Sequence, residues 1–306
     1  MRQETNKTLI VLSGPTASGK TGLSIELAKH LKTEICSADS RQFFKEMKIG
    51  TAVPSDSQLK AVPHHFIGHL SIHEQYNASR FEHDALAKLN ELFAVYDYVI
   101  LTGGSGMYVD AVCHGIDQMP DVPAGIRKQV DELLQQKGMD FLRDYLQQHD
   151  PEYFWQVDKD NPNRMKRGVE MHIATGKPFS DFRRQARPQR PFAIRKFALS
   201  WPRALLYERI NQRTEQMLAN GWLEEARLLL ENRALNALKT VGYRELFAFF
   251  DGEMSYDQAV EKIKTQTRRY AKRQITWLRR DPLISWVDMT KDEALKNILL
   301  TFDDAH

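Results

Sequence analysis

The chain has 306 residues, of which 42% are apolar, with a mean hydropathy of -0.51 and a formal net charge of +3. This composition excludes an intrinsically disordered chain, and no apolar run approaches the roughly 20 residues that a membrane span requires. The two cysteines, Cys36 and Cys113, exclude a disulfide framework and a cysteine-rich zinc module, and they favour a reducing, cytoplasmic location.

The N-terminal third alternates predicted strands with predicted helices. Short runs of β-branched and apolar residues predict strands at 8–13, 34–38 and 98–102, each typical of a strand buried on both faces. Apolar residues at helical spacing predict helices at 21–31 and 79–93. A strand, a helix and a parallel strand make a βαβ unit, so the sequence predicts an α/β fold with a parallel sheet flanked by helices.

After Gly115 the pattern changes to helices without strands. Helical periodicity covers 127–137, 139–149 and 162–174, and it ends before a basic stretch broken by proline at 183–191. We therefore expect an inserted all-helical domain at residues 113–195. The core domain would then consist of residues 1–112 and 196–306.

The C-terminal third returns to the sheet and continues in long helices. Residues 192–200 predict a strand, and the helices expected after it cover 203–220, 222–232, 242–250 and 255–280. The tail from Lys291 has no clear pattern.

Residues 14–21, GPTASGKT, fit the phosphate-binding pattern G-x-x-x-x-G-K-[ST] between a predicted strand and a predicted helix. A glycine-rich turn without a ligand is the alternative, and this setting argues against it. In such a loop, backbone N–H groups surround a phosphate at a helix N-terminus, while Lys20 adds charge and Thr21 offers a hydroxyl to Mg²⁺. We expect a P-loop NTPase-like fold that binds a diphosphate or triphosphate, as in ATP, through Gly14, Pro15, Thr16, Ala17, Ser18, Gly19, Lys20 and Thr21.

Asp39 follows the second predicted strand, whose carboxyl end should open into the ligand crevice. Nucleotide hydrolases of this class usually end a strand on a metal-binding Asp, but the third predicted strand ends at Gly103 without one. Asp39 is thus a candidate functional carboxylate. Because Asp39 and Ser40 would also suit the start of a helix, an N-cap role is the alternative, and the sequence alone leaves both open.

Two basic regions suggest a nucleic-acid partner. Between Lys262 and Arg280 the last long helix has eight basic residues and no acidic one, which favours contact with a phosphate backbone over a solvated helix surface. Trp277 in this helix is expected in the core rather than as a stacking platform for a base. The eight are Lys262, Lys264, Arg268, Arg269, Lys272, Arg273, Arg279 and Arg280. The second region, in the insertion, comprises Arg164, Lys166, Arg167, Arg183, Arg184, Arg187 and Arg190. The ten histidines, including the pair His64 and His65, have no spacing typical of a metal site.

Four stretches together resemble the tRNA dimethylallyltransferase (tRNA isopentenyltransferase) family, in its bacterial form. They are GPTASGKT at 14–21, the Asp39-Ser40 segment running into IGTAVP at 49–54, GGSGMY at 103–108, and AKRQITWLRR at 271–280. The segments 161–170 and 241–245 are also similar to stretches of this family, and the resemblance covers nearly the whole chain. The C-terminal zinc finger of some eukaryotic members has no counterpart in the sequence after Trp286.

The resemblance implies a reaction and its partners. A dimethylallyl group would pass from dimethylallyl diphosphate to N6 of the adenosine adjacent to the anticodon in tRNA, with Mg²⁺ and with release of diphosphate. The phosphate loop would then bind a leaving group, so no Asp is needed to activate a water. The implied partners are the anticodon stem-loop of tRNA and dimethylallyl diphosphate. No membrane is involved, and we expect a monomer.

The resemblance also implies roles for individual residues. Asp39 would be the general base on the adenine amino group, Ser105 would help to hold that site, Arg213 would contact the diphosphate, and Thr21 would be a metal ligand. Ser105 stands where the family members carry Thr, so the hydroxyl is kept and the methyl is lost. The residues placed against tRNA are Asp39, Ser40, Arg41, Gln42, Ser105, Arg127, Asn163, Arg164, Met165, Lys166, Arg167, Gly242, Tyr243, Arg244, Lys272, Arg273, Gln274, Ile275, Thr276, Trp277, Leu278 and Arg279.

Three other functions fit parts of the sequence. An adenylate isopentenyltransferase would use the same loop and Asp39 on a free nucleotide, although the basic helix argues against it. A small-molecule kinase would bind ATP at the loop and would release no diphosphate. A non-catalytic RNA-binding module would keep the loop as a vestige.

Overall fold

A computed structural model of the chain describes residues 7–117, 119–183 and 188–303. Arg184 and Arg187 of the second basic region lie outside the described residues. Among the described helices, none is both long enough and apolar enough to cross a bilayer.

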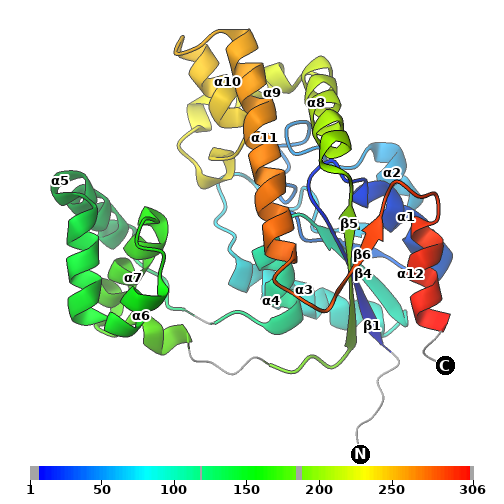
Figure 1. The fold of residues 1–306 in the computed structure, drawn as a ribbon, viewed down its shortest axis with the longest axis horizontal. Coiled ribbons are helices and arrows are strands. Elements are labelled where there is room, and N and C mark those ends of the chain that lie inside the picture. Colours follow the sequence, from blue (N-terminus) through cyan, green and yellow to red (C-terminus); the bar gives the residue numbers. More distant parts are fainter. Residues whose placement is uncertain (1–6, 118, 184–187, 304–306) are drawn as a thin grey trace, which may run out of the picture. The chain divides into compact units, whose positions relative to one another are not determined.

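Six parallel strands form one sheet in the order β3-β2-β4-β1-β5-β6 (Figure 1). The strand β1 pairs with β4 from Thr8 opposite Tyr98 onward, and with β5 from Thr8 opposite Ala193 onward. The predicted α/β fold with a P-loop NTPase-like parallel sheet is confirmed. The strands are β1 (Thr8–Ser13), β2 (Ile35–Ser37), β3 (His64–His65), β4 (Tyr98–Gly103), β5 (Ala193–Ser200) and β6 (Ile284–Asp288).

The sheet is covered by helices on both faces, and β1 shows why. Leu9 and Val11 pack into one hydrophobic cluster with α3 (Ala78–Phe93) and α4 (Gly106–His114). Ile10 and Leu12 point to the opposite face, where they pack with α1 (Lys20–Leu31) and α12 (Ala294–Asp303). Alternate side chains of a strand point to opposite faces, so an uninterrupted apolar run fits a strand buried on both sides.

Four α-helices lie between β5 and β6 in the chain, near the carboxyl ends of the strands (Figure 1). The helix α11 packs against α8, α10 and α4, and α9 packs against α8 and α10. This arrangement brings helices from the last third of the chain to the edge of the sheet where the phosphate loop lies. The helices are α8 (Arg203–Ala219), α9 (Trp222–Leu228), α10 (Tyr243–Phe250) and α11 (Tyr256–Leu278), and a short α2 (Asp56–Ala61) precedes β3.

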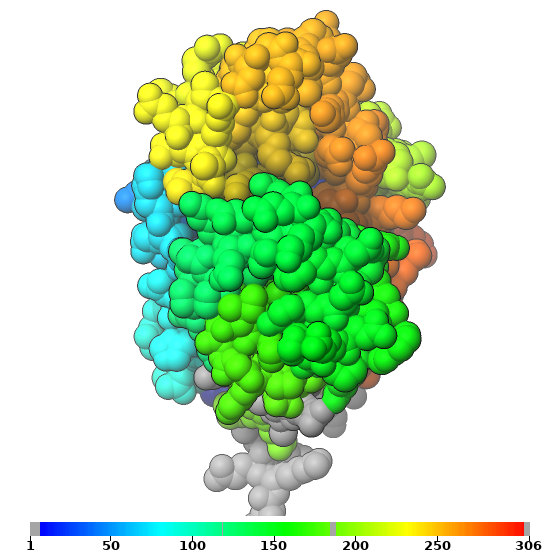
Figure 2. Space-filling model, turned by 90° about the vertical axis from the view of Figure 1, so that its left-hand side faces the viewer, coloured from blue at the N-terminus to red at the C-terminus, as the bar shows by residue number. Residues whose placement is uncertain are grey.

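The chain forms two compact units, a core unit of residues 1–114 and 189–306 and a helical unit of residues 115–188. The helical unit contains α5 (Ala124–His149), α6 (Pro151–Gln156) and α7 (Pro162–Thr175) around its own apolar cluster. The described residues of this unit are drawn in shades of green in Figure 2. Within α5, Gly138 has a non-helical φ of 72°, so α5 consists of two helices that meet at a kink there, as predicted.

Candidate active site

The phosphate loop, residues 14–21, joins the carboxyl end of β1 to the first turn of α1. The ammonium group of Lys20 donates hydrogen bonds to the carbonyl oxygens of Gly14 and Pro15, at 2.9 and 2.8 Å. Burial lowers the pKa of Lys20 to about 8; the Asp39 carboxylate raises that pKa in part, and the Arg213 guanidinium lowers it further. An anion bound in the loop would compensate a cation that the protein alone solvates poorly.

Asp39 follows β2 and lies at the start of a turn, not at the start of a helix. Its Oδ1 accepts a hydrogen bond from the backbone N of Arg41 at 3.1 Å, and its carbonyl oxygen accepts one from the N of Gln42 at 3.0 Å. Residues 40–42 adopt turn conformation, so the N-cap alternative is wrong. The Oδ2 atom accepts no hydrogen bond within the described part of the chain, which leaves it available to a ligand.

Ser105 holds the turn that follows Asp39. The Ser105 hydroxyl accepts a hydrogen bond from the backbone N of Ser40 at 2.9 Å and donates one to the Ser40 hydroxyl at 3.0 Å. These residues meet because β2 and β4 are neighbours, with Ser37 opposite Thr102 at their carboxyl ends. The side chain at position 105 therefore lies behind the Asp39 turn and fixes its backbone.

One cavity of about 1680 Å³ joins the phosphate loop to Asp39 and to helices α8 and α11. Its volume exceeds the roughly 300–1,000 Å³ typical of a small-molecule site, so a substrate larger than a diphosphate fits. Fourteen of the residues predicted for the site line it. They are Thr16, Ala17, Ser18, Gly19, Lys20, Thr21, Asp39, Ser40, Arg41, Gln42, Arg213, Arg244, Arg273 and Gln274.

Other predicted residues lie elsewhere in the two units. Met165 and Tyr243 are fully buried and Leu278 is 9% exposed, so their side chains are not available to an RNA. Trp277 is partly buried against the Gly106 backbone, as expected for a packing residue. Outside the lining of the cavity, Lys272 and Thr276 are exposed on α11 and Arg279 is exposed directly after it, whereas Ile275 is partly buried and Gly242 is buried. On the helical unit, Arg127, Asn163 and Arg164 are exposed, whereas Lys166 and Arg167 are partly buried.

Two residues of the second basic region, Arg190 and Lys166, form ion pairs within the protein. Arg190 pairs with Glu82 and donates to the carbonyl oxygens of Ala111 and Val112, and its side chain is 7% exposed. Lys166 pairs with Asp131. Arg190 is therefore a structural residue of the core unit and not part of an RNA-binding surface.

Arg209 lines the cavity and was not predicted from the sequence. Its Nε donates to the carbonyl oxygen of Ala17 at 2.9 Å, and its guanidinium carbon lies 4.4 Å from the centre of the Trp201 ring. Arg213, one turn later on α8, donates to the Thr16 hydroxyl at 3.4 Å, and burial lowers the pKa of this guanidinium. The spacing of four residues on a predicted helix was the available signal. Two arginines thus face the phosphate loop.

Glu225 on α9 fixes the 48–50 segment at the edge of the cavity. Its carboxylate accepts hydrogen bonds from three consecutive backbone N atoms, of Lys48, Ile49 and Gly50, at 2.8, 2.8 and 2.9 Å. It also accepts one from the Tyr243 hydroxyl at 2.7 Å. These contacts give the buried Tyr243 a structural role, and no sequence motif signals them.

Glu225→Gln should lower the free energy of unfolding by about 2 kcal/mol, because an amide leaves one or more of these partly buried donors unpaired. Urea denaturation measures the change. The neighbouring exposed Glu224→Gln is the matched control and should change stability by less than about 0.5 kcal/mol. An equal loss in both variants would show that the 48–50 contacts do not contribute.

The side chains beside Lys20 provide few oxygen ligands for Mg²⁺. Thr21 lines the cavity beside Lys20, and among the described residues no group of three or more His, Cys, Asp and Glu side chains could hold a metal. Mg²⁺ is commonly bound through one or two protein oxygens together with substrate phosphates. A single hydroxyl at the start of a phosphate loop fits that mode, with the diphosphate supplying further oxygens.

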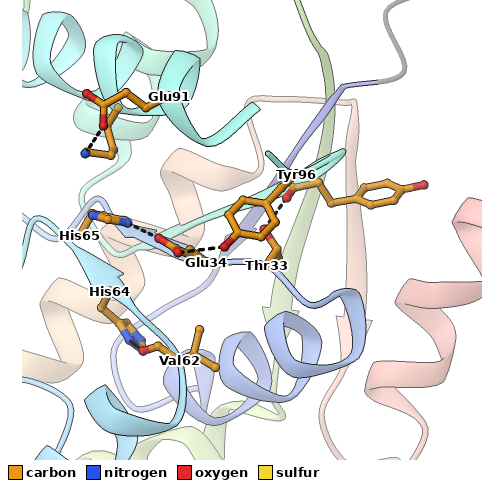
Figure 3. Close-up of polar contacts among 9 residues, drawn as sticks. Thr33, Glu34, Val62, His64, His65, Glu91 and Tyr96 are labelled. Carbon is orange, nitrogen blue, oxygen red and sulfur yellow. Dashed lines mark hydrogen bonds and ion pairs between the residues drawn. The ribbon is translucent and has the colours of Figure 1, made fainter. Parts of the chain in front are cut away.

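The adjacent histidines His64 and His65 make separate polar contacts within the core unit (Figure 3). The His65 Nε2 lies 2.6 Å from Glu34, whose other oxygen accepts a hydrogen bond from the Tyr96 hydroxyl at 3.0 Å. The His64 Nδ1 instead lies 2.8 Å from the carbonyl oxygen of Val62. Glu34 precedes β2, so this polar cluster lies at the amino end of the strands, away from the phosphate loop.

Comparison with known proteins adds four findings. The model of the IPP transferase family matches residues 42–281. A tRNA dimethylallyltransferase of Christiangramia forsetii is 50% identical over 95% of this chain and 95% of its own length. The structure of a tRNA isopentenylpyrophosphate transferase from Bacillus halodurans aligns with a TM-score of 0.72 and 30% identity, covering 97% of this chain and 96% of that chain. A eukaryotic dimethylallyltransferase acting on tRNA aligns with a TM-score of 0.76 and 25% identity over 92% of this chain and 74% of that chain.

Proposed function

The chain belongs to the IPP transferase family, and from this membership we propose that it transfers a dimethylallyl group from dimethylallyl diphosphate to N6 of the adenosine adjacent to the anticodon in tRNA. The observation that carries the proposal is the cavity lined by both the phosphate loop and Asp39. A donor diphosphate and an acceptor base can therefore meet in one space. Because its substrate is tRNA, we also propose that the enzyme acts in the cytoplasm. We further propose that it acts as a monomer.

The phosphate loop would hold the diphosphate of the donor. Backbone N–H groups in the first turn of α1, the Lys20 ammonium and the guanidinium groups of Arg209 and Arg213 would supply positive charge where the diphosphate gains charge as the allylic C–O bond opens. When bound, Mg²⁺ would add further positive charge there, with Thr21 as its protein ligand. In prenyl transfer, unlike hydrolysis, no side chain has to activate a water.

Asp39 would act as the general base on the acceptor. The adenine N6 forms a bond to C1 of the dimethylallyl group, the C1–O bond breaks, and diphosphate leaves with the electron pair of that bond. The N6 proton passes to the Asp39 carboxylate. Its Oδ2, without a protein partner in the described part of the chain, is the oxygen open to this proton, while Ser105 supports the Asp39 turn through Ser40.

The exposed basic residues of α11 would bind the tRNA backbone. Not all eight of the basic residues counted in this helix are available, because Lys264 pairs with Glu215 and Glu261, and Arg268 donates to Asn211 and Thr265. The prediction that these basic residues have no counter-charge was therefore wrong. Glu215 comes from α8, and Glu261 directly precedes the counted stretch. The exposed members are Lys262, Arg269, Lys272 and Arg273 on α11, and Arg279 and Arg280 directly after it.

Neutralising Arg269, Lys272 and Arg273 to Gln should weaken tRNA binding and reduce its salt dependence by about one unit of log–log slope for each phosphate that the variant no longer neutralises. Binding isotherms at several salt concentrations measure the slope. Lys29→Gln, on the exposed part of α1, is the control and should leave the slope unchanged. If the triple variant has the slope of the wild type, this surface does not contact the RNA.

Labelled dimethylallyl diphosphate distinguishes the candidate reactions. We expect the label on unmodified tRNA, with release of inorganic diphosphate, and none on AMP. Label on AMP alone would identify an adenylate isopentenyltransferase, and phosphoryl transfer from ATP without diphosphate release would identify a kinase. Absence of transfer to any acceptor, with RNA binding retained, would leave only an RNA-binding module.

A further inference from the structure

One face of α11 packs against the glycine turn, which we define as residues 103–106, from the last residue of β4 to the first residue of α4. Tyr270, Gln274 and Trp277 follow the spacing i, i+4, i+7 and so share this face. The Tyr270 hydroxyl donates to the carbonyl oxygen of Gly104 at 3.4 Å. A Cβ atom at Gly106 would lie 2.5 Å from the Trp277 ring, so the helix and the turn meet with no room for a side chain.

The Gln274 side-chain amide joins this turn to the phosphate loop. Its Oε1 accepts a hydrogen bond from the backbone N of Thr16 at 2.8 Å, and its Nε2 donates to the carbonyl oxygen of Gly104 at 2.8 Å. The residue is 8% exposed, and a Cβ atom at Gly104 would lie 2.5 Å from the amide nitrogen. The amide oxygen and the amide nitrogen of Gln274 therefore each form a hydrogen bond, and each bond is to a different loop.

In the proposed reaction, the phosphate loop would bind the donor, and the glycine turn supports the segment that contains the general base. Thr16 belongs to the phosphate loop, and its hydroxyl accepts from Arg213. Gly104 precedes Ser105, whose hydroxyl fixes Ser40 next to Asp39. Gln274 thus stands between the donor subsite and the base.

We propose that Gln274 is a positioning residue that fixes the phosphate loop relative to the Asp39 turn, instead of a side chain that contacts tRNA. This inference rests on the proposed prenyl transfer, because it assigns the donor to one loop and the acceptor to the other. A nearly isosteric side chain without polar atoms should leave both substrates bound but misplaced. Misplacement of the reacting groups by about 1 Å costs about 10²-fold in rate.

Gln274→Met should therefore lower kcat for tRNA prenylation by about 10²-fold, with little change in KM for tRNA or for dimethylallyl diphosphate and with an unchanged salt dependence of tRNA binding. The control is Gln266→Met, at a partly buried glutamine of α11 that makes no side-chain hydrogen bond within the described part of the chain. It should retain the kcat of the wild type.

A second variant separates positioning from folding. Gln274→Glu keeps an acceptor for the Thr16 N, but its carboxylate has no donor for the Gly104 carbonyl; once protonated, the introduced carboxyl has both. The charged or titratable groups that line the same cavity as Gln274 include Lys20, Asp39, Arg41, Arg209, Arg213, Tyr270 and Arg273. The ratio of the variant kcat to the wild-type kcat should rise as the pH is lowered for Gln274→Glu and stay flat for Gln274→Met.

Three results would overturn the inference. A raised KM for tRNA with kcat unchanged would make Gln274 an RNA contact. A wild-type kcat per folded molecule, with only a lower melting temperature, would leave it a packing residue. A flat kcat ratio for Gln274→Glu across pH would show that the donor to Gly104 does not matter. If the wild type itself transfers no dimethylallyl group to tRNA, the proposed function fails instead, and the two failures are distinct.

Discussion

Asp39→Asn is expected to lower kcat for tRNA prenylation by about 10²–10⁴-fold, the usual contribution of a general base. The adenine amino group is a weak nucleophile because its lone pair is delocalised into the ring, and it must lose a proton as the C–N bond forms. An amide keeps the size of the carboxylate and can still accept from the N of Arg41, but it does not take up that proton. Single-turnover measurements with saturating substrates give the rate of this step.

The binding and stability of Asp39→Asn identify which role the substitution removes. We expect near-normal thermal stability and near-normal affinity for tRNA, because the turn at residues 40–42 keeps its hydrogen bond. Diphosphate binding should be compared at about pH 7, since the Asp39 charge raises the pKa of Lys20 and its removal favours a neutral amine. Asp292→Asn, at an exposed aspartate, is the control. A variant that turns over tRNA at the wild-type rate would make Asp39 a turn residue only.

Lys20→Met is expected to weaken the binding of inorganic diphosphate by about 10- to 100-fold, because a charge-assisted donor to phosphate contributes about 1.5–3 kcal/mol. It should not destabilise the fold, since the lysine charge is poorly solvated in the free protein. Titration calorimetry with Mg²⁺ present measures the affinity. Unchanged affinity and kinetics would contradict the assignment of residues 14–21 as the diphosphate site.

The pH dependence of the same binding gives an independent check. The pKa of Lys20 is lowered to about 8 in the ligand-free protein, and a bound diphosphate favours the charged amine. Wild-type affinity should therefore fall as the pH rises above about 8, with uptake of a proton on binding. Lys20→Met should lose this part of the pH dependence. Calorimetry in buffers of different ionisation enthalpy measures the proton uptake.

The parts of the fold that the sequence predicted are those with a local signal. An apolar run ending at Gly14 identified β1 and the loop after it, and the family resemblance is confirmed by the match over residues 42–281. The edge strand β6 was missed because three of its five residues are exposed, so it lacks an apolar run. The helix α12 was missed in a tail whose pattern was mixed, although it packs on the sheet through Ala294 and Ile298.

The candidate site was less predictable, because its contacts join distant parts of the chain. The bond between Gln274 and Thr16 links the last long helix to the first loop, and no local pattern in either segment signals the other. The same holds for Glu225 and the 48–50 segment. Motifs located the chemistry at the phosphate loop and Asp39, whereas three-dimensional packing decided which of the family-like residues line the cavity and which, such as Tyr243, are buried.

The strand order has a consequence for synthesis on the ribosome. The central strand β1 can pair with β4 early, but its other neighbour, β5, begins only at Ala193, after the whole helical unit. At typical elongation rates of about 5–20 residues per second, translation of the intervening chain takes on the order of ten seconds or more. During that interval the edge of β1 that later carries β5 has no strand partner, and the helical unit, with its own apolar cluster, is complete first. The nascent chain is therefore most open to chaperones, and to mispairing, before β5 emerges.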